Sequence, residues 1–205
     1  MFSLWRMSMV DTISIVPSTT LDLPIATRLT AAGFAVPVSD ALARDVHAHL
    51  RAGELWTVMQ DTTSVGYAIV RRYFADTLYI VGIMLMPQWR GQRVCERVVA
   101  ATRQPTDQFL ALRTASPIMW AAGNRICNGA WLPNPRSLNE QELVERGMRL
   151  AREIGCSGFP HSPGFYGSPL YGVEPRHRDA DTQAWWATQC DYQRADAVVC
   201  IGRLP

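Results

Sequence analysis

One segment of the chain limits its possible folds more than any other. An apolar run over residues 77–86 ends at a proline and leads into the sequence Gln-Trp-Arg-Gly-Gln-Arg-Val-Cys at positions 88–95, which we interpret as a strand, a tight loop and a helix start. The first backbone amides of a helix have no partner within it and lie at the positive end of its dipole, so they favour a bound anion. Gly91 lets a phosphate approach the backbone, and Arg90 and Arg93 add donors for phosphate oxygens. The segment therefore predicts a site for a phosphorylated cofactor.

The segments around this one predict a mixed sheet. The expected strands are Thr12 to Val16, Leu55 to Gln60, Val65 to Arg72, Thr77 to Met86, Gln108 to Thr114 and Ala197 to Ile201. A helix over Arg90 to Thr102 lies between the fourth and fifth strands. Strand, helix and strand in that order form a crossover, which pairs the two strands in parallel. We therefore expect an antiparallel first half and a parallel pair at the crossover.

Helix start and stop signals place the remaining elements. They predict a helix over Pro24 to Ala32 ended by Gly33, a helix capped by Ser39 that carries Leu42, Val46 and Leu50 with Gly53 beyond it, a helix over Ser116 to Ile126 with Pro117 in its first turn, a helix that follows the capping box Ser137 to Glu140 and ends at Gly155, and a helix over Asp181 to Cys190. Gly158 to Pro175 is rich in Gly, Pro and aromatic residues, so the region of about residues 156–179 is expected to form a loop or lid.

Composition narrows the class of protein. A chain of 205 residues fits one domain, and 48% apolar with 19% charged residues is typical of a soluble globular protein. A net charge of +2 does not favour a nucleic-acid partner. The five cysteines include no Cys-x-x-Cys pair, which indicates reduced thiols in a cytoplasm. Met1 to Val10 lacks the core of a signal peptide, and no stretch approaches the ~18 apolar residues of a membrane span. All twenty basic residues are arginine, for which genome composition and selection against amine modification both stay open.

The order of elements resembles the Gcn5-related N-acetyltransferase (GNAT) superfamily, and residues 85–95 are similar to its acyl-coenzyme A signature. In that signature an Arg/Gln-x-x-Gly-x-Gly/Ala loop follows a hydrophobic residue, any residue and a proline. Arg90 matches the leading Arg/Gln, and Gly91 the glycine that often follows it. Arg93 stands where the signature prefers Gly, and Cys95 where it prefers Gly or Ala, so both are departures. The resemblance covers about residues 12–114, and the placement of the loop between strand and helix supplies most of its value.

The resemblance implies an α+β fold in which helices flank a mixed, mostly antiparallel central sheet with a V-shaped splay. It implies acetyl-CoA or another acyl-CoA as co-substrate. The backbone of Met84, Leu85 and Met86 would pair with the pantetheine arm, and the amides of Gln92, Arg93, Val94 and Cys95 would hold the pyrophosphate. Ser116 stands where the family often has an Asn near the cofactor arm.

Catalytic groups are harder to place from the sequence. Amine acylation needs a base for the ammonium proton and often an acid for the thiolate. Many family members have a Glu on the long strand, where this chain offers only Tyr79 and Asp76, and Trp120 stands in the segment where a catalytic Tyr often lies. The remaining candidates are in the late loop and comprise His161, Tyr166, Tyr171, Glu174 and His177, of which His161, Tyr166 and Tyr171 are our candidate catalytic residues.

Ordinary structural roles compete with these interpretations. Arg90 and Gly91 could form a simple tight turn, and Met84 and Met86 usually fill a core. Cys95 could be a nucleophile at a helix start, although a small residue fitting a crowded turn is the favoured interpretation. His161, Glu174, His177 and Asp179 match no metal-ligand spacing, so we expect a solvated loop and no metal. Trp185 and Trp186 are expected to pack against the sheet rather than to stack on a base.

The sequence thus favours an acyl-CoA-dependent N-acyltransferase that passes an acetyl group to a primary amine by direct attack. The acceptor stays open among a small metabolite, an antibiotic-type amine, a peptide and a modified base, and a homodimer stays open as well. One alternative is a non-catalytic acyl-CoA-binding sensor or interaction module. Another is a GNAT-like enzyme that modifies a nucleic-acid base, which would need a local arginine-rich face.

Overall fold

The structure, a computed structural model, describes residues 13–136 and 140–205. Its strands are β1 (Ile13–Ser18), β2 (Glu54–Gln60), β3 (Thr63–Tyr73), β4 (Thr77–Leu85), β5 (Phe109–Thr114), β6 (Trp131–Leu132), β7 (His161–Ser162) and β8 (Ala197–Arg203). Its helices are α1 (Leu23–Phe34), α2 (Asp40–Leu50), the 3-10 turn η2 (Pro87–Trp89), α3 (Val94–Thr102), α4 (Pro117–Ile126), α5 (Gln141–Glu153) and α6 (Ala180–Gln189).

The strands form one mixed sheet in the order β1-β2-β3-β4-β5-β8-β6, with β7 paired to β8. The β4–β5 pair is parallel, and the other pairs in the described chain are antiparallel. The crossover through α3 accounts for the parallel pair. The expected fold class, a mostly antiparallel mixed sheet flanked by helices, is therefore confirmed.

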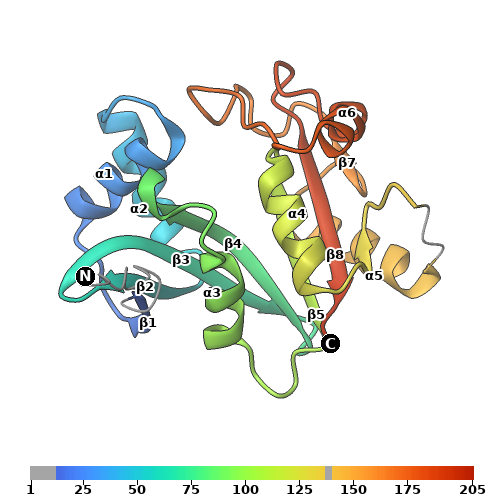
Figure 1. Cartoon of the computed structure of the whole chain (residues 1–205), viewed down its shortest axis with the longest axis horizontal. Coiled ribbons are helices and arrows are strands. Elements are labelled where there is room, and N and C mark those ends of the chain that lie inside the picture. The colour runs from blue at the N-terminus through green and yellow to red at the C-terminus, as the bar shows by residue number, and fades with distance from the viewer. Residues whose placement is uncertain (1–12, 137–139) are drawn as a thin grey trace, which may run out of the picture.

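The sheet opens where β4 and β5 separate. Their parallel pairing runs from Thr77 opposite Phe109 to Ile80 opposite Leu112, but β4 continues to Leu85 and β5 to residue 114. At the same point β4 has a bulge, because two consecutive residues of β3 pair with Ile80 and Gly82 and skip Val81. A bulge bends a strand and increases its twist, which turns the second half of β4 away from β5. Figure 1 shows the resulting V, and the expected splay is confirmed.

Helices cover both faces of this sheet. Neighbouring residues of β3 show the division, because Tyr67 packs with α1 and α2 whereas Ala68 packs with α3. Thr30 on α1 hydrogen-bonds the Tyr67 hydroxyl at 2.6 Å. Farther along the sheet, α5 lies on the Tyr67 side and α4 on the α3 side, as the alternation of side chains along β5 requires. The opening of the V therefore has a wall of helices on each face.

The two tryptophans of α6 belong to the core cluster on the sheet, as expected, and their ring contacts are with α4. Trp185 lies 4.5 Å and Trp186 6.3 Å from Trp120 on α4, measured between ring centroids. Trp186 is buried, and Trp185 is half-buried. These ring contacts with Trp120 attach α6 to α4.

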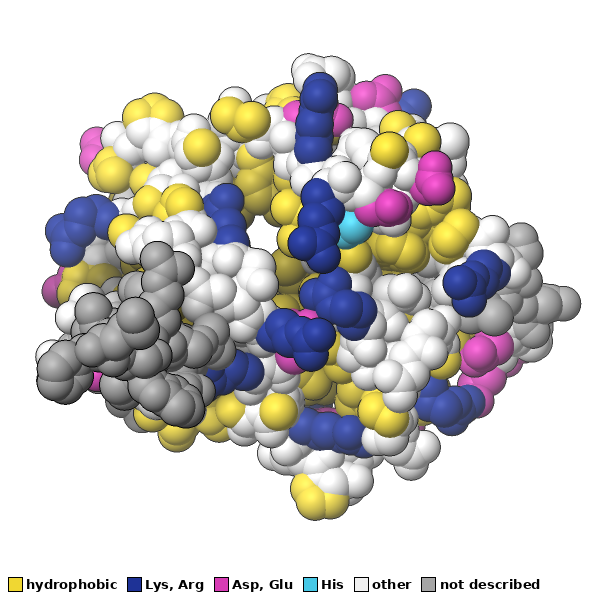
Figure 2. All heavy atoms as spheres, viewed as in Figure 1, with side chains coloured by type: hydrophobic (Ala, Val, Ile, Leu, Met, Phe, Trp, Pro, Cys, Tyr) yellow, Lys and Arg dark blue, Asp and Glu magenta, His cyan; other side chains and the backbone are white. Residues whose placement is uncertain are grey.

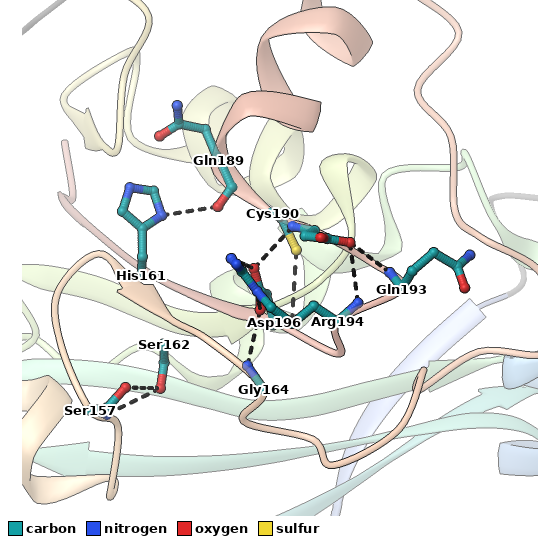
Figure 3. A network of polar contacts seen from close by, with 10 residues as sticks. Ser157, His161, Ser162, Gly164, Gln189, Cys190, Gln193, Arg194 and Asp196 are labelled. Atoms are coloured by element: carbon teal, nitrogen blue, oxygen red, sulfur yellow. Dashed lines mark hydrogen bonds and ion pairs between the residues drawn. The ribbon is translucent and has the colours of Figure 1, made fainter.

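A network of polar contacts ties the late loop to the start of β8 (Figure 3). The carboxylate of buried Asp196 accepts hydrogen bonds from the amides of Gly164 at 3.0 Å and Asp191 at 3.1 Å, and it pairs with Arg194 at 2.6 Å. The Arg194 side chain and these hydrogen bonds lower the pKa of Asp196 to about 2. These contacts therefore hold Gly164, in the late loop, against the residue that precedes β8.

Two element ends differ clearly from the expectation, and two short strands were not expected. Helix α1 runs through Gly33 and ends at the left-handed residue Ala35, because buried Gly33 lies against β4 instead of terminating the helix. Helix α3 begins at Val94 rather than Arg90, since η2 and two residues of positive φ precede it. Strands β6 and β7, of two residues each, were not predicted. The start of the predicted capping box, residues 137–139, lies outside the described residues, as does Thr12.

No helix in the described parts of the chain is both long and apolar enough to cross a bilayer.

Candidate active site

The loop between β4 and α3 presents backbone donors at the mouth of the V. Trp89 is buried beneath it, Gly91 has φ of 74°, and Arg93 caps α3 in the left-handed conformation with φ of 56°. Positive φ favours glycine, which explains why the signature prefers Gly where this chain has Arg93. Space around Gly91 is open, because a Cβ atom there would meet nothing within 4 Å.

The first turn of α3 leaves its amides free of helical acceptors. The amide of Arg97 is the first to donate within this helix, to the Arg93 carbonyl at 3.2 Å. The amides of Val94, Cys95 and Glu96 precede it, so geometry gives them no acceptor inside the helix. A group that bears several anionic oxygens would satisfy them.

These donors open into a cleft of about 1900 Å³ between the two arms of the V. The free half of β4, the loop, the end of β5 and the start of α4 line it, and so do the predicted site residues Met84, Leu85, Arg90, Gly91, Arg93, Val94, Cys95, Ser116, Tyr166 and Tyr171. Seven arginines and four acidic residues also contribute to its walls. Figure 2 shows arginine side chains gathered down the middle of the face where the arms meet. The cleft is therefore suited to an anionic ligand.

Two predicted cofactor residues have the predicted group engaged elsewhere, and a third lies outside the cleft. The Arg90 guanidinium donates through Nη2 to the Gly33 carbonyl, so it holds the loop against α1. Met86 donates its amide to the Val65 carbonyl at 3.0 Å, which leaves that amide unavailable to a ligand. Gln92 bonds through its side chain to the Gln88 carbonyl at 2.9 Å and does not line the cleft.

Cys95 has the properties of a buried thiol. Burial, and then the Glu96 carboxylate, raise the pKa of Cys95 to about 12. The thiolate is the nucleophilic form, so a thiol with this pKa is inert at neutral pH. The structure favours the interpretation of Cys95 as a small residue in a crowded turn.

The late loop, which includes residues 166–172, covers the cleft and contacts both of its sides. Tyr171 packs edge-on against Phe34 of α1 with ring centroids 4.9 Å apart, and Gly172 donates its amide to the Phe34 carbonyl at 2.7 Å. From the other side, the Tyr192 hydroxyl donates to the Tyr171 carbonyl. A Cβ atom on Gly172 would lie 2.0 Å from the Ala35 carbonyl oxygen, so this contact requires glycine.

Tyr166 and Tyr171 both face this cleft. Burial raises the pKa of each phenol, and the Tyr171 hydroxyl is hydrogen-bonded to Thr114 at the end of β5. A phenol with a raised pKa keeps its proton at neutral pH. Both side chains can therefore act as hydrogen-bond donors or proton donors.

His161 lies apart from the two tyrosines. It belongs to β7, opposite Val198, and its exposed ring hydrogen-bonds the Gln189 carbonyl through Nδ1 at 2.9 Å (Figure 3). It does not line the cleft. The neighbouring candidates Asp179 and His177 serve the start of α6, where Asp179 accepts from the Thr182 amide at 2.8 Å and donates its own amide to His177. Within residues 13–136 and 140–205, no group of three or more His, Cys, Asp or Glu converges on a metal position.

The structure brings in one histidine that the sequence did not single out. His49, in the last turn of α2, lines the cleft beside the bulge of β4, and its buried Nε2 has no hydrogen-bond partner among the described residues. A Cβ atom on Gly82 would lie 2.5 Å from this nitrogen. Burial, and then the charge of Arg113, lower the pKa of His49. A neutral imidazole with a free nitrogen is a competent base. The available sequence signal was Gly82, since a glycine inside an apolar strand indicates close approach of another group.

Searches for known relatives gave structural matches only. No protein-family model and no curated protein matches the sequence. A GNAT family acetyltransferase from Elizabethkingia anophelis with acetyl-CoA bound is 12% identical over 95% of this chain and 99% of its own, with a TM-score of 0.47. A ribosomal-protein-S18-alanine N-acetyltransferase from Escherichia coli is 14% identical over 94% of both chains, with a TM-score of 0.49. A Bacillus subtilis acetyltransferase in complex with CoA is 12% identical over 94% of this chain and 99% of its own, with a TM-score of 0.47.

The order of the sheet, the parallel β4–β5 pair, its divergence after Ile80 and the crossover through α3 are the features that the resemblance implies. The fold of this chain is therefore a mixed, mostly antiparallel sheet flanked by helices, with one parallel strand pair that diverges.

Proposed function

We propose that the chain is an acyl-CoA-dependent N-acyltransferase that passes an acetyl group from acetyl-CoA to a primary amine. One observation carries the proposal. Beyond Ile80 the edge of β4 that faces β5 has no strand partner in the described chain, and it runs directly to the uncapped amides of α3. A strand edge next to a helix N-terminus offers a row of backbone groups followed by an anion site. A thioester carrier with amide groups in its arm and a diphosphate at its end fits both parts.

The proposed placement follows the lining of the cleft. The amides of Gly91, Arg93, Val94 and Cys95 would hold the diphosphate. The backbone groups of Met84 and Leu85 on the free side of β4 would pair with the pantetheine arm. Ser116, buried at the start of α4, would face this arm from the other side. The acyl end would then reach the bulge of β4 near Gly82, under the His49 ring.

The reaction at that point is a direct aminolysis. His49 Nε2 takes the proton of the acceptor ammonium, the free amine attacks the thioester carbonyl, a C–N bond forms and the C–S bond breaks. Tyr171 or Tyr166 gives its proton to the departing thiolate, and the second proton of the attacking nitrogen restores that phenol as the amide forms. Orientation in a closed cleft can lower the barrier by roughly 7–11 kcal/mol, and a positioned base adds about 10²–10⁴-fold in rate.

A second candidate is a non-catalytic acyl-CoA sensor. It is favoured by the free half of β4, whose residues 81–85 are Val-Gly-Ile-Met-Leu and carry no ionisable side chain. A sensor would bind acyl-CoA in the same cleft without turnover. Release of free thiol from acetyl-CoA in the presence of an amine panel separates the two candidates.

Calorimetric titration of the full chain with acetyl-CoA tests the cofactor assignment. Gly91→Val places a branched side chain before the α3 amides at a residue of positive φ, so binding should be lost. Gly155→Val is the matched control, since Gly155 also has positive φ and open space but does not line the cleft. Loss of binding in the first variant alone supports the proposal. Unchanged affinity in Gly91→Val, or no binding by the native chain, contradicts it.

A further inference from the structure

Arg113 occupies the point at which the two arms of the V separate. It follows Leu112, the last residue of β5 that pairs with β4, and it lines the cleft. The Cζ atom of its guanidinium lies 3.9 Å from the centroid of the Phe165 ring and 5.7 Å from the centroid of the Tyr166 ring. The guanidinium donates a hydrogen bond to the Tyr166 hydroxyl oxygen, and its Nη1 donates to the Ile154 carbonyl at 3.5 Å. The late loop thus holds this side chain against the sheet.

This cation has no carboxylate partner in the described chain. None of the ion pairs found there includes Arg113, and its buried Nε atom has no hydrogen-bond acceptor. Its neighbours are neutral phenols, a ring face and a carbonyl oxygen. A charged group removed from water is costly unless an opposite charge accompanies it, and ring faces compensate for only part of the loss. A bound anion would complete the site.

The position of Arg113 indicates which part of a substrate would bring that anion. Side chains alternate along β5, so Ala111 packs with α5, Leu112 with α3 and α4, and Arg113 again lies on the α5 side. His49 lies on the same side, close enough for the Arg113 charge to affect it. The amides of α3 are on the opposite face of the sheet. Arg113 therefore belongs to the acceptor half of the cleft rather than to the diphosphate site.

We propose that Arg113 binds a substrate carboxylate, and that the acceptor is an amino-acid-like molecule whose amine meets His49 Nε2 while its carboxylate pairs with the guanidinium. This inference rests on the proposed function and adds the chemical class of the acceptor. A carboxylate at the end of the acyl chain, as in succinyl-CoA, is the other source of the same chemistry. Planar, bidentate pairing makes arginine suited to either source.

The test compares amines that differ only in the carboxylate. The full chain is assayed for thiol release from acetyl-CoA with common L-amino acids and with the matching amines that lack the carboxyl group. Amino acids should be used with a kcat/KM about ten- to a hundredfold higher, because a charge-assisted hydrogen bond lost from a buried site has roughly that effect. A second set of assays combines succinyl-CoA with the simple amines. A preference for succinyl-CoA there assigns the carboxylate to the acyl chain.

Variants of Arg113 test whether this residue causes the preference for amines that carry a carboxylate. At pH 8, above the ordinary pKa of histidine, Arg113→Gln should raise the KM for amino acids by about ten- to a hundredfold and leave the KM for the simple amines unchanged. Arg113→Lys should recover part of the loss. Arg149→Gln is the control, because Arg149 on α5 also stacks on a ring, that of Phe74 at 4.0 Å, but does not line the cleft. The comparison of amines with the native chain needs no variant, so it stands if Arg113→Gln fails to fold.

Two results overturn the inference. One is equal use of amines with and without the carboxylate together with no gain from succinyl-CoA. The other is an Arg113→Gln variant that affects both classes of amine equally. Calorimetry with acetyl-CoA separates the failures, since a native chain that binds acetyl-CoA without carboxylate preference contradicts this inference alone. A native chain that does not bind acetyl-CoA contradicts the proposed function, and the inference with it.

Discussion

His49 Nε2 lies directly over Gly82, so that a Cβ atom at residue 82 would be 2.5 Å from this nitrogen. The contact joins the last turn of α2 to the bulge at which β4 leaves β5. It places a buried imidazole nitrogen that has no hydrogen-bond partner among the described residues beside the proposed position of the thioester. The role of His49 is therefore open to direct tests.

Replacing His49 by Gln should lower kcat by about 10²–10⁴-fold, because the amide is not a base, while the Kd for acetyl-CoA stays unchanged. Steady-state assays and calorimetry measure the two quantities. His47→Gln is the control, since His47 is exposed in the same turn of α2. A His49 variant with native kcat would contradict the assignment. Gly82→Ala should also lower kcat, since its methyl group must displace the ring.

The pH dependence of kcat/KM should report the same imidazole. Burial and the Arg113 charge lower the pKa of His49 from 6.5, so the base is already neutral at pH 7 and the acid limb of the profile should lie below 6.5. In Arg113→Gln this limb should move upward toward 6.5, because the repelling charge is gone, and in His49→Gln it should disappear. A limb that keeps its position in both variants would assign it to another group.

Arg90 should act through the loop that it supports. Arg90→Gln removes the hydrogen bond to the Gly33 carbonyl, and the Kd for acetyl-CoA should rise about three- to tenfold, in line with roughly 0.5–1.5 kcal/mol for one hydrogen bond. Calorimetry gives the value. Arg28→Gln, at an exposed position of α1, should leave the Kd unchanged. Equal effects of both substitutions would remove any special role from the Arg90 contact.

Asp196 should stabilise the fold in a manner that depends on pH. Its pKa of about 2 in the folded chain lies below its ordinary value of 3.8, so its contribution is complete above pH 3.8 and is lost as pH falls toward 2. Asp196→Asn should lower the free energy of unfolding at pH 7 by about 1–3 kcal/mol, since the carboxylate accepts three sets of hydrogen bonds. Urea unfolding at pH 7 and pH 3 should show a smaller difference at pH 3.

Asp181→Asn, at an exposed position in the first turn of α6, should change the unfolding free energy far less. A difference between native chain and Asp196→Asn that is the same at pH 7 and pH 3 would mean that the carboxylate does not act through its charge.

Local sequence signals were sufficient for much of the fold. The strand β4, the loop with Gly91 and the helix α3 are consecutive in the chain, so their order and the parallel crossover followed from the sequence. The start of α3 was placed too early because the positive φ of Arg93 depends on the fit of the loop over Trp89. The very short strands β6 and β7 exist only as partners of β8 and have no periodicity of their own.

The acceptor half of the cleft could not be predicted in the same way. His49 and Arg113 are far apart in the sequence, and each looks like an ordinary residue of an amphipathic helix or a strand. Only the bulge after Ile80 and the late loop bring both to one side of the sheet. His161 was singled out by residue type alone, although its backbone pairing with β8 carries it away from the cleft. The single domain, the cytoplasmic location and the roles of the cofactor residues stay predictions.

The divergence of β4 from β5 also affects how the protein avoids aggregation through its strand edges. An unpaired strand edge invites strands of other molecules, and natural sheets usually shorten, charge or cover such edges. Here the edge lies between the helices on the two faces of the sheet. The late loop, which is hydrogen-bonded to Phe34 through Gly172, covers it. The strand edge that is left open for a ligand is therefore covered in the way that natural sheets cover their exposed edges.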